Sequence, residues 1–248
     1  MRRFGLVGFP LTHSFSKSYF TQKFAKEGIT DAEYENFEIP SISHFPKLLK
    51  LNPELVGLNV TIPYKQEVMG YLNHLDKSAE IVGAVNVIKV GQDNKLTGYN
   101  SDYYGFMESL KLFLPTKEAA IEALILGTGG AAKAVEAVLK TLNIPYKLVS
   151  RERKTAAVQY QEVNEEVLTQ HQLIINTSPL GMYPKTETCP PIQYDALNSN
   201  HFLFDLVYNP ETTLFMKKGL EKNAKVKNGL EMLHLQAEKA WEIWNKED

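Results

Sequence analysis

A glycine-rich turn near the middle of the chain has the residue types and spacing of a phosphate-binding loop. The apolar run 124–126 precedes Gly127, Gly129 and Ala132, which match the pattern G-x-G-x-x-A. Gly127 allows a tight turn, Gly129 lets the backbone approach a pyrophosphate, and Ala132 lets helix and strand pack closely. The free N–H groups of the following helix favour a bound phosphate. The pattern therefore predicts a dinucleotide site, and the alternative is a glycine turn without a ligand.

The charged segment after the next expected strand indicates which dinucleotide binds. NAD enzymes usually carry Asp or Glu there, because its carboxylate accepts a hydrogen bond from the ribose 2′-OH. This chain has Ser150, Arg151, Glu152, Arg153 and Lys154. Arg151 could stack on adenine and pair with a 2′-phosphate, with Arg153 or Lys154 as a second charge, so NADP is favoured. Glu152 could repel that phosphate or hold the ribose of NAD, and the whole run could also be a solvated loop.

Four polar segments in the first half of the chain are more specific than structure alone requires. They are residues 8–16 (GFPLTHSFS), 58–65 (LNVTIPYK), 83–87 (GAVNV) and 98–105 (GYNSDYYG). Ser14 and Ser16 stand two positions apart after an expected strand, so both hydroxyls could point at one carboxylate. Either serine could instead cap a helix, which is a common role for serine.

In these segments, and in their order, the chain resembles the shikimate dehydrogenase family. That family shows G-x-P-x-x-H-S-x-S, N-V-T-x-P-x-K, G-A-V-N, G-x-N-T-D-x-x-G, a G-x-G-G-A cofactor loop, a segment from N-T to G-M, and a late M-L-x-x-Q. The last three correspond to residues 127–131, 176–182 and 232–236. The departures are Lys17, Tyr19, Phe20, Ser101 and Ser150. None of them removes a group that the chemistry needs.

The resemblance implies an enzyme that reversibly reduces 3-dehydroshikimate to shikimate with NADP, in the biosynthesis of aromatic amino acids. It implies Lys65 and Asp102 as the catalytic residues. It implies a substrate site of Ser14, Ser16, Thr61, Asn86, Tyr208 and Gln236. It implies a cofactor site of Gly127, Gly129, Gly130, Ala131, Ser150, Arg151, Lys154, Asn176, Thr177, Met182 and Gly229. Structural roles compete with these, since Asn86 could cap a turn and Tyr208 could simply pack.

Lys65 and Asp102 suit the oxidation of a secondary alcohol. A hydride leaves carbon while a proton leaves oxygen, and an amine can accept that proton when its ammonium form is disfavoured. Burial of Lys65 would disfavour the ammonium form, and a nearby Asp102 carboxylate would favour it. Lys65 is therefore either the acid–base group or a stabiliser of alkoxide charge, with Asp102 orienting it. Without its motif, Lys65 would be interpreted as a surface lysine in the first turns of a helix.

Three other functions stay open on the sequence. An NAD-dependent quinate/shikimate dehydrogenase is opposed by Arg151 and kept open by Glu152. A methylenetetrahydrofolate dehydrogenase-like enzyme shares the two-domain build but is opposed by the serine segment and the lysine motif. A nucleotide-sensing binding protein is opposed by the retention of both catalytic residues.

The composition is that of an ordinary soluble globular protein. The 248 residues are 44% hydrophobic and 23% charged, and the net charge is −2, which gives no sign of a nucleic-acid or membrane surface. Cys189 is the only cysteine, so an internal disulfide is impossible, and the histidines show no metal-ligand spacing. Pro10 comes too early for a signal-peptide core. We expect no metal, a cytoplasmic location, and a monomer or homodimer.

The order of expected elements indicates an α/β protein of two lobes with a cleft between them, because strands alternate with helices as in parallel βαβ units. We expect strands at 4–7, 34–39, 55–60, 84–90, 95–99, 121–126, 146–149, 173–176 and 202–207. We expect helices at 16–26, 42–51, 129–142, 212–222 and 230–244, and another beginning at Pro63. By resemblance, residues 1–104, completed by 229–248, bind shikimate, and residues 105–228 form a Rossmann-type NADP domain. The last helix packs back on the first domain and carries Gln236.

Overall fold

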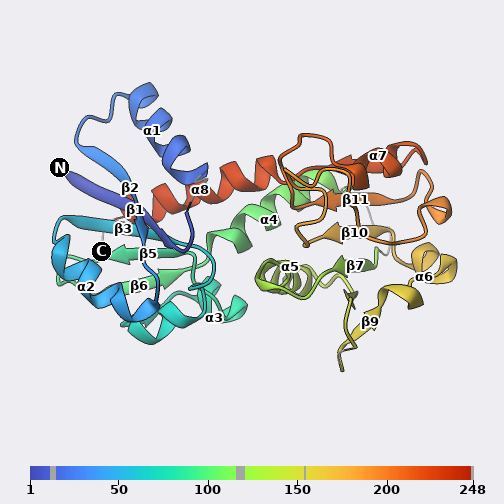
Figure 1. Cartoon of the computed structure of the whole chain (residues 1–248), viewed down its shortest axis with the longest axis horizontal. Helices are drawn as coiled ribbons and strands as arrows, with labels where there is room; N and C mark the ends of the chain where they lie inside the picture. The colour runs from blue at the N-terminus through green and yellow to red at the C-terminus, as the bar shows by residue number, and fades with distance from the viewer. Residues whose placement is uncertain (12–14, 116–120, 154, 247–248) are drawn as a thin grey trace. The chain divides into compact units, whose positions relative to one another are not determined.

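The chain divides into two compact units (Figure 1). The computed structural model describes residues 1–11, 15–115, 121–153 and 155–246. Unit 1 consists of residues 1–104 and 236–248, and unit 2 consists of residues 105–235. The chain thus returns to unit 1 at Gln236, whereas the sequence analysis places that return at Gly229.

Unit 1 is built on a mixed six-stranded sheet. Its strands are β1 (Arg2–Gly8), β2 (Ala32–Glu38), β3 (Leu55–Val60), β4 (His74–Leu75), β5 (Val87–Val90) and β6 (Leu96–Tyr99). Its helices are α1 (Phe15–Glu27), η1 (Ile42–His44), α2 (Phe45–Leu51), η2 (Glu67–Tyr71) and α3 (Lys77–Val82). The strand order is β2-β1-β3-β5-β6-β4. β1 is parallel to β2 and β3, whereas β5 is antiparallel to β3 and β6.

Alternate residues of β1 face opposite sides of this sheet, as the strand period of two requires. Phe4 packs in one cluster with Phe20 of α1 and with Trp244 of the C-terminal helix α8 (Leu230–Asn245). Val7 packs in a second cluster with Phe45 of α2. Helices therefore cover both sheet faces, and the C-terminal helix packs on unit 1 as the sequence predicts.

Unit 2 is built on a six-stranded sheet in which every pairing is parallel. Its strands are β7 (Ala123–Leu126), β8 (Tyr146–Ser150), β9 (Ala157–Gln159), β10 (Leu173–Asn176), β11 (Phe202–Asp205) and β12 (Lys225–Lys227). Its helices are α4 (Ser101–Phe113, which begins in unit 1), α5 (Gly130–Thr141), η3 (Tyr160–Glu162), α6 (Glu165–Gln170), η4 (Tyr194–Ala196) and α7 (Leu214–Leu220). β7, β10 and β11 are buried at every position, as expected for strands with both faces covered.

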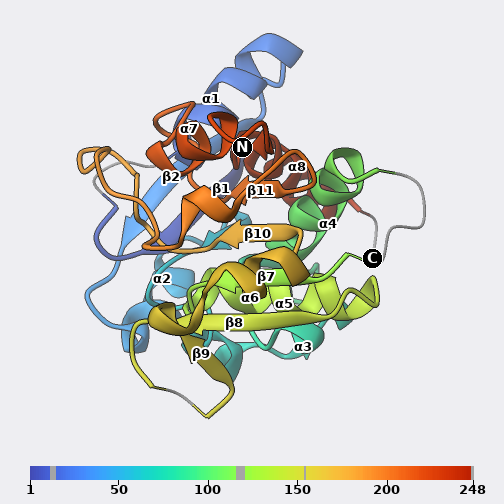
Figure 2. The ribbon, with the colours of Figure 1, turned by 90° about the vertical axis from the view of Figure 1, so that its right-hand side faces the viewer.

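The strand order of unit 2 is β12-β11-β10-β7-β8-β9. Figure 2 shows β11, β10, β7, β8 and β9 in this order. From β7 the chain moves outward to β8 and β9, and it then returns to β10 on the other side of β7. Ligands of open α/β sheets bind at such a reversal, beyond the carboxyl ends of the strands. The glycine turn follows β7, and the arginine segment follows β8, so both lie at this edge.

Two differences from the expected elements lie next to Lys65 and Asp102. The helix expected at Pro63 is wrong, because residues 61–66 form turns that lead into the short η2. The carbonyl of Lys65 accepts a hydrogen bond from the Val85 N–H at 2.7 Å, which takes it out of a helical pattern. Helix α4 was not foreseen, although Asn100 offers the signal, since its side chain caps the Tyr103 N–H at 3.0 Å. None of the helices in the described ranges is long and apolar enough to cross a membrane.

Candidate active site

Lys65 and Asp102 form an ion pair in unit 1. The Lys65 Nζ lies 2.7 Å from Asp102 Oδ2. Lys65 follows β3, and Asp102 lies in the first turn of α4. Their side chains are 29% and 16% exposed, so the pair is partly shielded from water and still open to a ligand.

The segment 83–87 holds both members of this pair in place. The Val85 N–H donates to the carbonyl of Lys65, and Asn86 Oδ1 accepts from the Ser101 N–H at 2.7 Å, next to Asp102. Asn86 is 4% exposed, and its Nδ2 also donates to Gln236 Oε1 at 3.3 Å. One short stretch therefore fixes the backbone on either side of the ion pair, and Asn86 does cap a turn, as the structural alternative proposed.

A second set of polar side chains extends from Asn86 across the sheet. Asn59 Nδ2 donates to the Asn86 carbonyl at 3.3 Å, and Asn59 Oδ1 accepts from Tyr34 Oη at 2.7 Å. Ser16 bonds the Tyr34 hydroxyl, whose pKa is raised by burial. The sequence predicts no role for Tyr34 or Asn59, although Asn59 opens the N-V-T motif. They position the residues around the ion pair.

The remaining candidate substrate residues are Thr61, Ser14 and Tyr208. The Thr61 N–H donates to the Val7 carbonyl at 2.9 Å, which places the half-buried Thr61 at the carboxyl end of β3. Ser14 lies outside the described residues. Tyr208 lies in unit 2, in the loop after β11, where its side chain is 37% exposed and burial of the phenol raises its pKa.

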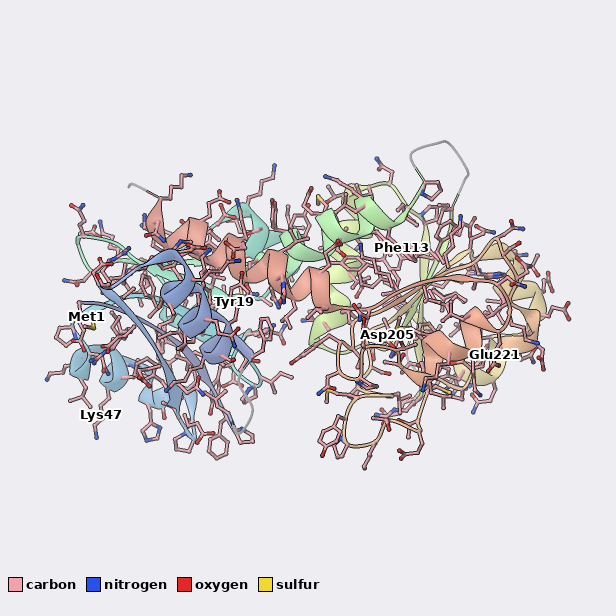
Figure 3. The ribbon with its side chains drawn as sticks, turned by 90° about the horizontal axis from the view of Figure 1, so that it is seen from above. Met1, Tyr19, Lys47, Phe113, Asp205 and Glu221 are labelled. Atoms are coloured by element: carbon pink, nitrogen blue, oxygen red, sulfur yellow. The ribbon has the colours of Figure 1, made fainter. Side chains whose placement is uncertain are left out.

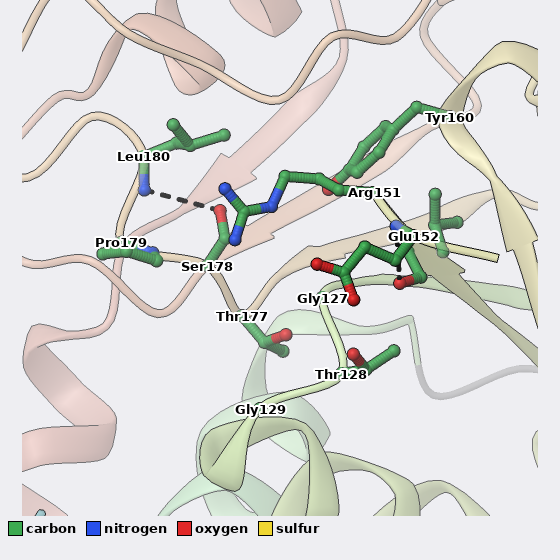
Figure 4. Close-up of a pocket in the computed structure, with 12 residues that line it drawn as sticks. Gly127, Thr128, Gly129, Arg151, Glu152, Tyr160, Thr177, Ser178, Pro179 and Leu180 are labelled. Carbon is green, nitrogen blue, oxygen red and sulfur yellow. Dashed lines mark hydrogen bonds between the residues drawn. The ribbon is translucent and has the colours of Figure 1, made fainter. Parts of the chain in front are cut away.

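A pocket of about 380 Å³ opens at the strand reversal of unit 2 (Figure 4). This volume is within the range of ~300–1,000 Å³ usual for small-molecule sites. The pocket is formed by the turns after β7, β8 and β10 and by η3. Its lining is Gly127, Thr128, Gly129, Val149, Ser150, Arg151, Glu152, Tyr160, Thr177, Ser178, Pro179 and Leu180.

The glycines of this pocket separate into two kinds. Gly127 has φ +126°, and a Cβ there would lie 2.6 Å from Thr177 Oγ1, so the protein itself requires glycine. Gly129 caps α5 with φ −85°, and a Cβ on Gly129 or Gly130 would meet nothing within 4 Å. Neither conformation nor packing explains glycine at these two positions. The close approach of a bound pyrophosphate would explain glycine at both positions, so the turn fits a dinucleotide.

The segment after β8 brings opposite charges to the pocket. The Arg151 guanidinium extends toward the Ser178 side, and the Glu152 carboxylate extends toward the Gly127 side (Figure 4). Ser150 is 5% exposed, and its hydroxyl accepts from the Glu152 N–H at 3.3 Å, which shapes the turn. Lys154 lies outside the described residues.

Asn176 supports the pocket from behind rather than lining it. Its side chain is fully buried, and its Nδ2 donates to Asp205 Oδ1 at 2.9 Å. Its Oδ1 accepts from both the N–H and the hydroxyl of Ser178, at 3.1 and 2.6 Å. Thr177 and Ser178 face the pocket in its place. The Asn176 side chain therefore positions Ser178, and a direct contact of Asn176 with the cofactor stays a prediction.

Other cofactor candidates also have different surroundings from those expected. Ala131 is exposed on α5, and Met182 is 46% exposed, but neither lines the pocket. Gly229 is required by packing, because a Cβ there would overlap the carbonyl of Leu206. This contact explains the glycine, and a role of Gly229 in cofactor binding stays a prediction.

Comparison with known proteins identifies a family that this chain matches. A sequence profile described as "Shikimate dehydrogenase substrate binding domain" matches residues 6–88. The NADP(+) shikimate dehydrogenase of Clostridium beijerinckii is 40% identical over an alignment that covers 99% of this chain and 93% of that protein. The chain belongs to the shikimate dehydrogenase family.

Solved structures of the shikimate dehydrogenase family have the same fold. A chorismate mutase/shikimate 5-dehydrogenase fusion protein from Clostridium acetobutylicum aligns with a TM-score of 0.88 at 34% identity, over 99% of this chain and 91% of that one. The Thermus thermophilus enzyme, in complex with NADP(H) and shikimate, aligns with a TM-score of 0.85 at 28% identity, over 99% and 94%. The resemblance and the fold class expected from the sequence are confirmed.

One buried carboxylate in this shikimate dehydrogenase fold was not foreseen. Asp205 (labelled in Figure 3) is fully buried, and its oxygens accept from Asn176, from the Val207 N–H at 3.0 Å and from Thr213 Oγ1 at 2.6 Å. Burial raises its pKa to about 6, against the lowering effect of these three bonds. Asp205 ties the loop behind the pocket to the turn before α7.

This raised pKa predicts how the stability of the chain depends on pH. The folded state binds the Asp205 proton more tightly than the unfolded state, so the stabilisation is full below pH 3.8 and is lost as the pH rises through about 6. Asp205→Asn removes this dependence. We expect the free energy of unfolding of the natural chain, relative to that variant, to rise by about 3 kcal/mol at most as the pH falls across this window. Urea unfolding at a series of pH values measures it, and a difference that does not change with pH would contradict the assignment.

Proposed function

We propose that this chain catalyses the reversible reduction of 3-dehydroshikimate to shikimate, with NADPH and a proton consumed and NADP⁺ formed, as a step of the shikimate pathway. The observation that carries the proposal is the Lys65–Asp102 pair at 2.7 Å, within a unit whose sequence matches a family's substrate-binding domain. Relatives named as NADP-dependent shikimate dehydrogenases, and a neighbour solved with NADP(H) and shikimate, support it.

The ion pair stabilises the negative charge that develops on the substrate oxygen and transfers the proton. Bound NADPH supplies the hydride to the carbonyl carbon. One N–H of the Lys65 ammonium donates a hydrogen bond to Asp102. The other N–H groups can donate to the substrate oxygen, which gains negative charge. Lys65 then donates a proton to that oxygen, and in the oxidative direction it accepts the proton again. Asp102 accepts the hydrogen bond from Lys65 and so orients Lys65.

The substrate is held by short polar side chains around this pair. Asn86, Gln236 and Thr61 offer amide and hydroxyl groups suited to ring hydroxyls, and Ser16 offers a hydroxyl for the carboxylate. Ser14 and Tyr208 are assigned on the motif resemblance alone. Residues 1–104 with the C-terminal segment are thus proposed as the substrate domain, and the intervening residues as the NADP domain. A cytoplasmic location and a monomeric or dimeric state stay predictions.

The direct test is nicotinamide reduction by the purified chain with shikimate, run in parallel with NADP and NAD, and with quinate in place of shikimate. Turnover with shikimate and NADP supports the proposal. Comparable turnover with quinate moves the chain to the bifunctional quinate/shikimate class. No turnover with any pair of substrates overturns the proposed activity.

Arg151 is proposed to bind the 2′-phosphate that distinguishes NADP from NAD. Among the described residues the exposed guanidinium makes no ion pair within the chain, so it is available to a phosphate. Arg151→Gln is expected to weaken NADPH binding by about tenfold to a hundredfold while leaving NADH binding nearly unchanged. Fluorescence titration with each dinucleotide measures both effects, and equal weakening of the two would assign Arg151 to another part of the cofactor.

A further inference from the structure

The cofactor pocket holds a carboxylate as well as a guanidinium. Glu152 lines the pocket together with the glycine turn and Arg151. The two side chains diverge, since the Arg151 guanidinium extends toward Ser178 and the Glu152 carboxylate extends toward Gly127 (Figure 4). The pocket is therefore not uniformly positive, in contrast to what a site built for a phosphate alone would require.

No internal role accounts for the Glu152 carboxylate. Within the described ranges it makes no ion pair and no side-chain hydrogen bond, and the residue is exposed. Its backbone N–H alone is engaged, by the Ser150 hydroxyl at 3.3 Å. That bond fixes the backbone of Glu152 at the carboxyl end of β8, the place from which a side chain reaches the adenosine ribose in this type of sheet.

A carboxylate at this place acts oppositely on the two cofactors. It accepts a hydrogen bond from the 2′-OH of an unphosphorylated ribose. It repels a 2′-phosphate, which carries nearly two negative charges at neutral pH. Arg151 has the opposite preference, so the difference in affinity between NADP and NAD is set by both side chains.

We propose that Glu152 is a cofactor-specificity residue that admits NAD to this site and lowers the preference for NADP that Arg151 creates. The inference rests on the proposed function only in taking the pocket as a nicotinamide dinucleotide site. It predicts that this chain binds both cofactors, with a smaller difference between the NADH and NADPH dissociation constants than Arg151 alone would give.

The test compares NADPH and NADH binding to the full chain and to Glu152→Gln, by titration of nicotinamide fluorescence without substrate. Glutamine keeps the shape and removes the charge. We expect the ratio of the NADH to the NADPH dissociation constant to rise about tenfold in this variant, mainly through tighter NADPH binding. Glu166→Gln is the matched control, because Glu166 is exposed on α6 outside the pocket and the change in net charge is the same.

The ratio decides the outcome. An unchanged ratio in Glu152→Gln, or an equal rise in Glu166→Gln, overturns the inference, since the carboxylate would then act only through net charge or not at all. If the chain binds both dinucleotides but does not turn over shikimate, the proposed substrate fails while the binding ratio still tests Glu152. If neither dinucleotide binds, both proposals fail.

Discussion

A Lys65→Met variant is expected to lose about 10³-fold in kcat for shikimate oxidation, because it removes both the proton acceptor and the charge that stabilises the developing alkoxide. Methionine keeps the length and much of the volume of lysine. The side chain is 29% exposed and its ion partner is 16% exposed, so the loss of folding stability should be small. NADPH titration of the variant should match that of the natural chain, which separates a catalytic loss from a binding loss.

Lys111→Met is the matched control for this experiment. Lys111 lies on α4, the helix that carries Asp102, and its 48% exposed side chain pairs with Glu108. Its replacement should leave kcat unchanged. A Lys65→Met variant with kcat close to that of the natural chain would exclude Lys65 from the reaction and return the binding-protein alternative to consideration.

A Lys65→Arg variant tests whether Lys65 transfers the proton, as proposed, or acts mainly through its charge. Arginine keeps a positive charge beside Asp102, but its guanidinium does not release a proton in the accessible pH range. If Lys65 acts mainly through its charge, the variant should keep a substantial part of kcat. If Lys65 transfers the proton, the variant should be about as inactive as Lys65→Met.

The glycine turn gives the second large effect, as a contrast between two variants. Gly129→Ala is expected to weaken NADPH binding by at least about tenfold and to leave the free energy of unfolding nearly unchanged, because its Cβ meets no protein atom within 4 Å and φ is −85°. Gly127→Ala is expected to lower the free energy of unfolding by about 1–3 kcal/mol, because φ is +126° and the Cβ would lie 2.6 Å from Thr177 Oγ1.

Urea unfolding and NADPH titration of both variants measure this contrast. If a bound pyrophosphate is the reason for glycine at 129, Gly129→Ala should weaken NADPH binding without lowering the free energy of unfolding. Gly129→Ala with unchanged NADPH affinity would contradict it, because the open space beside Gly129 would then not be where the pyrophosphate lies.

Local signals in the sequence predict most elements of the fold. The apolar strands around residues 124, 148 and 174 and the helix after Gly129 appear close to the expected places, because periodicity, helix capping and glycine conformations act over a few residues. The helix expected at Pro63 failed because the Lys65 carbonyl is taken by Val85, far along the chain. No local pattern carries that information.

The sequence by itself determined the family, the two α/β units and the glycine turn, and it predicted Lys65 and Asp102 as the catalytic pair, because these depend on short motifs in a given order. Only the tertiary structure decided that Lys65 meets Asp102 at 2.7 Å, that Asn59 and Tyr34 support them, and that burial raises the pKa of Asp205 to about 6. It also decided that packing within the chain requires glycine at 229, whereas no protein atom within 4 Å requires it at 129. Each of these depends on which distant segments come together and how much water they exclude, and a one-dimensional pattern contains neither.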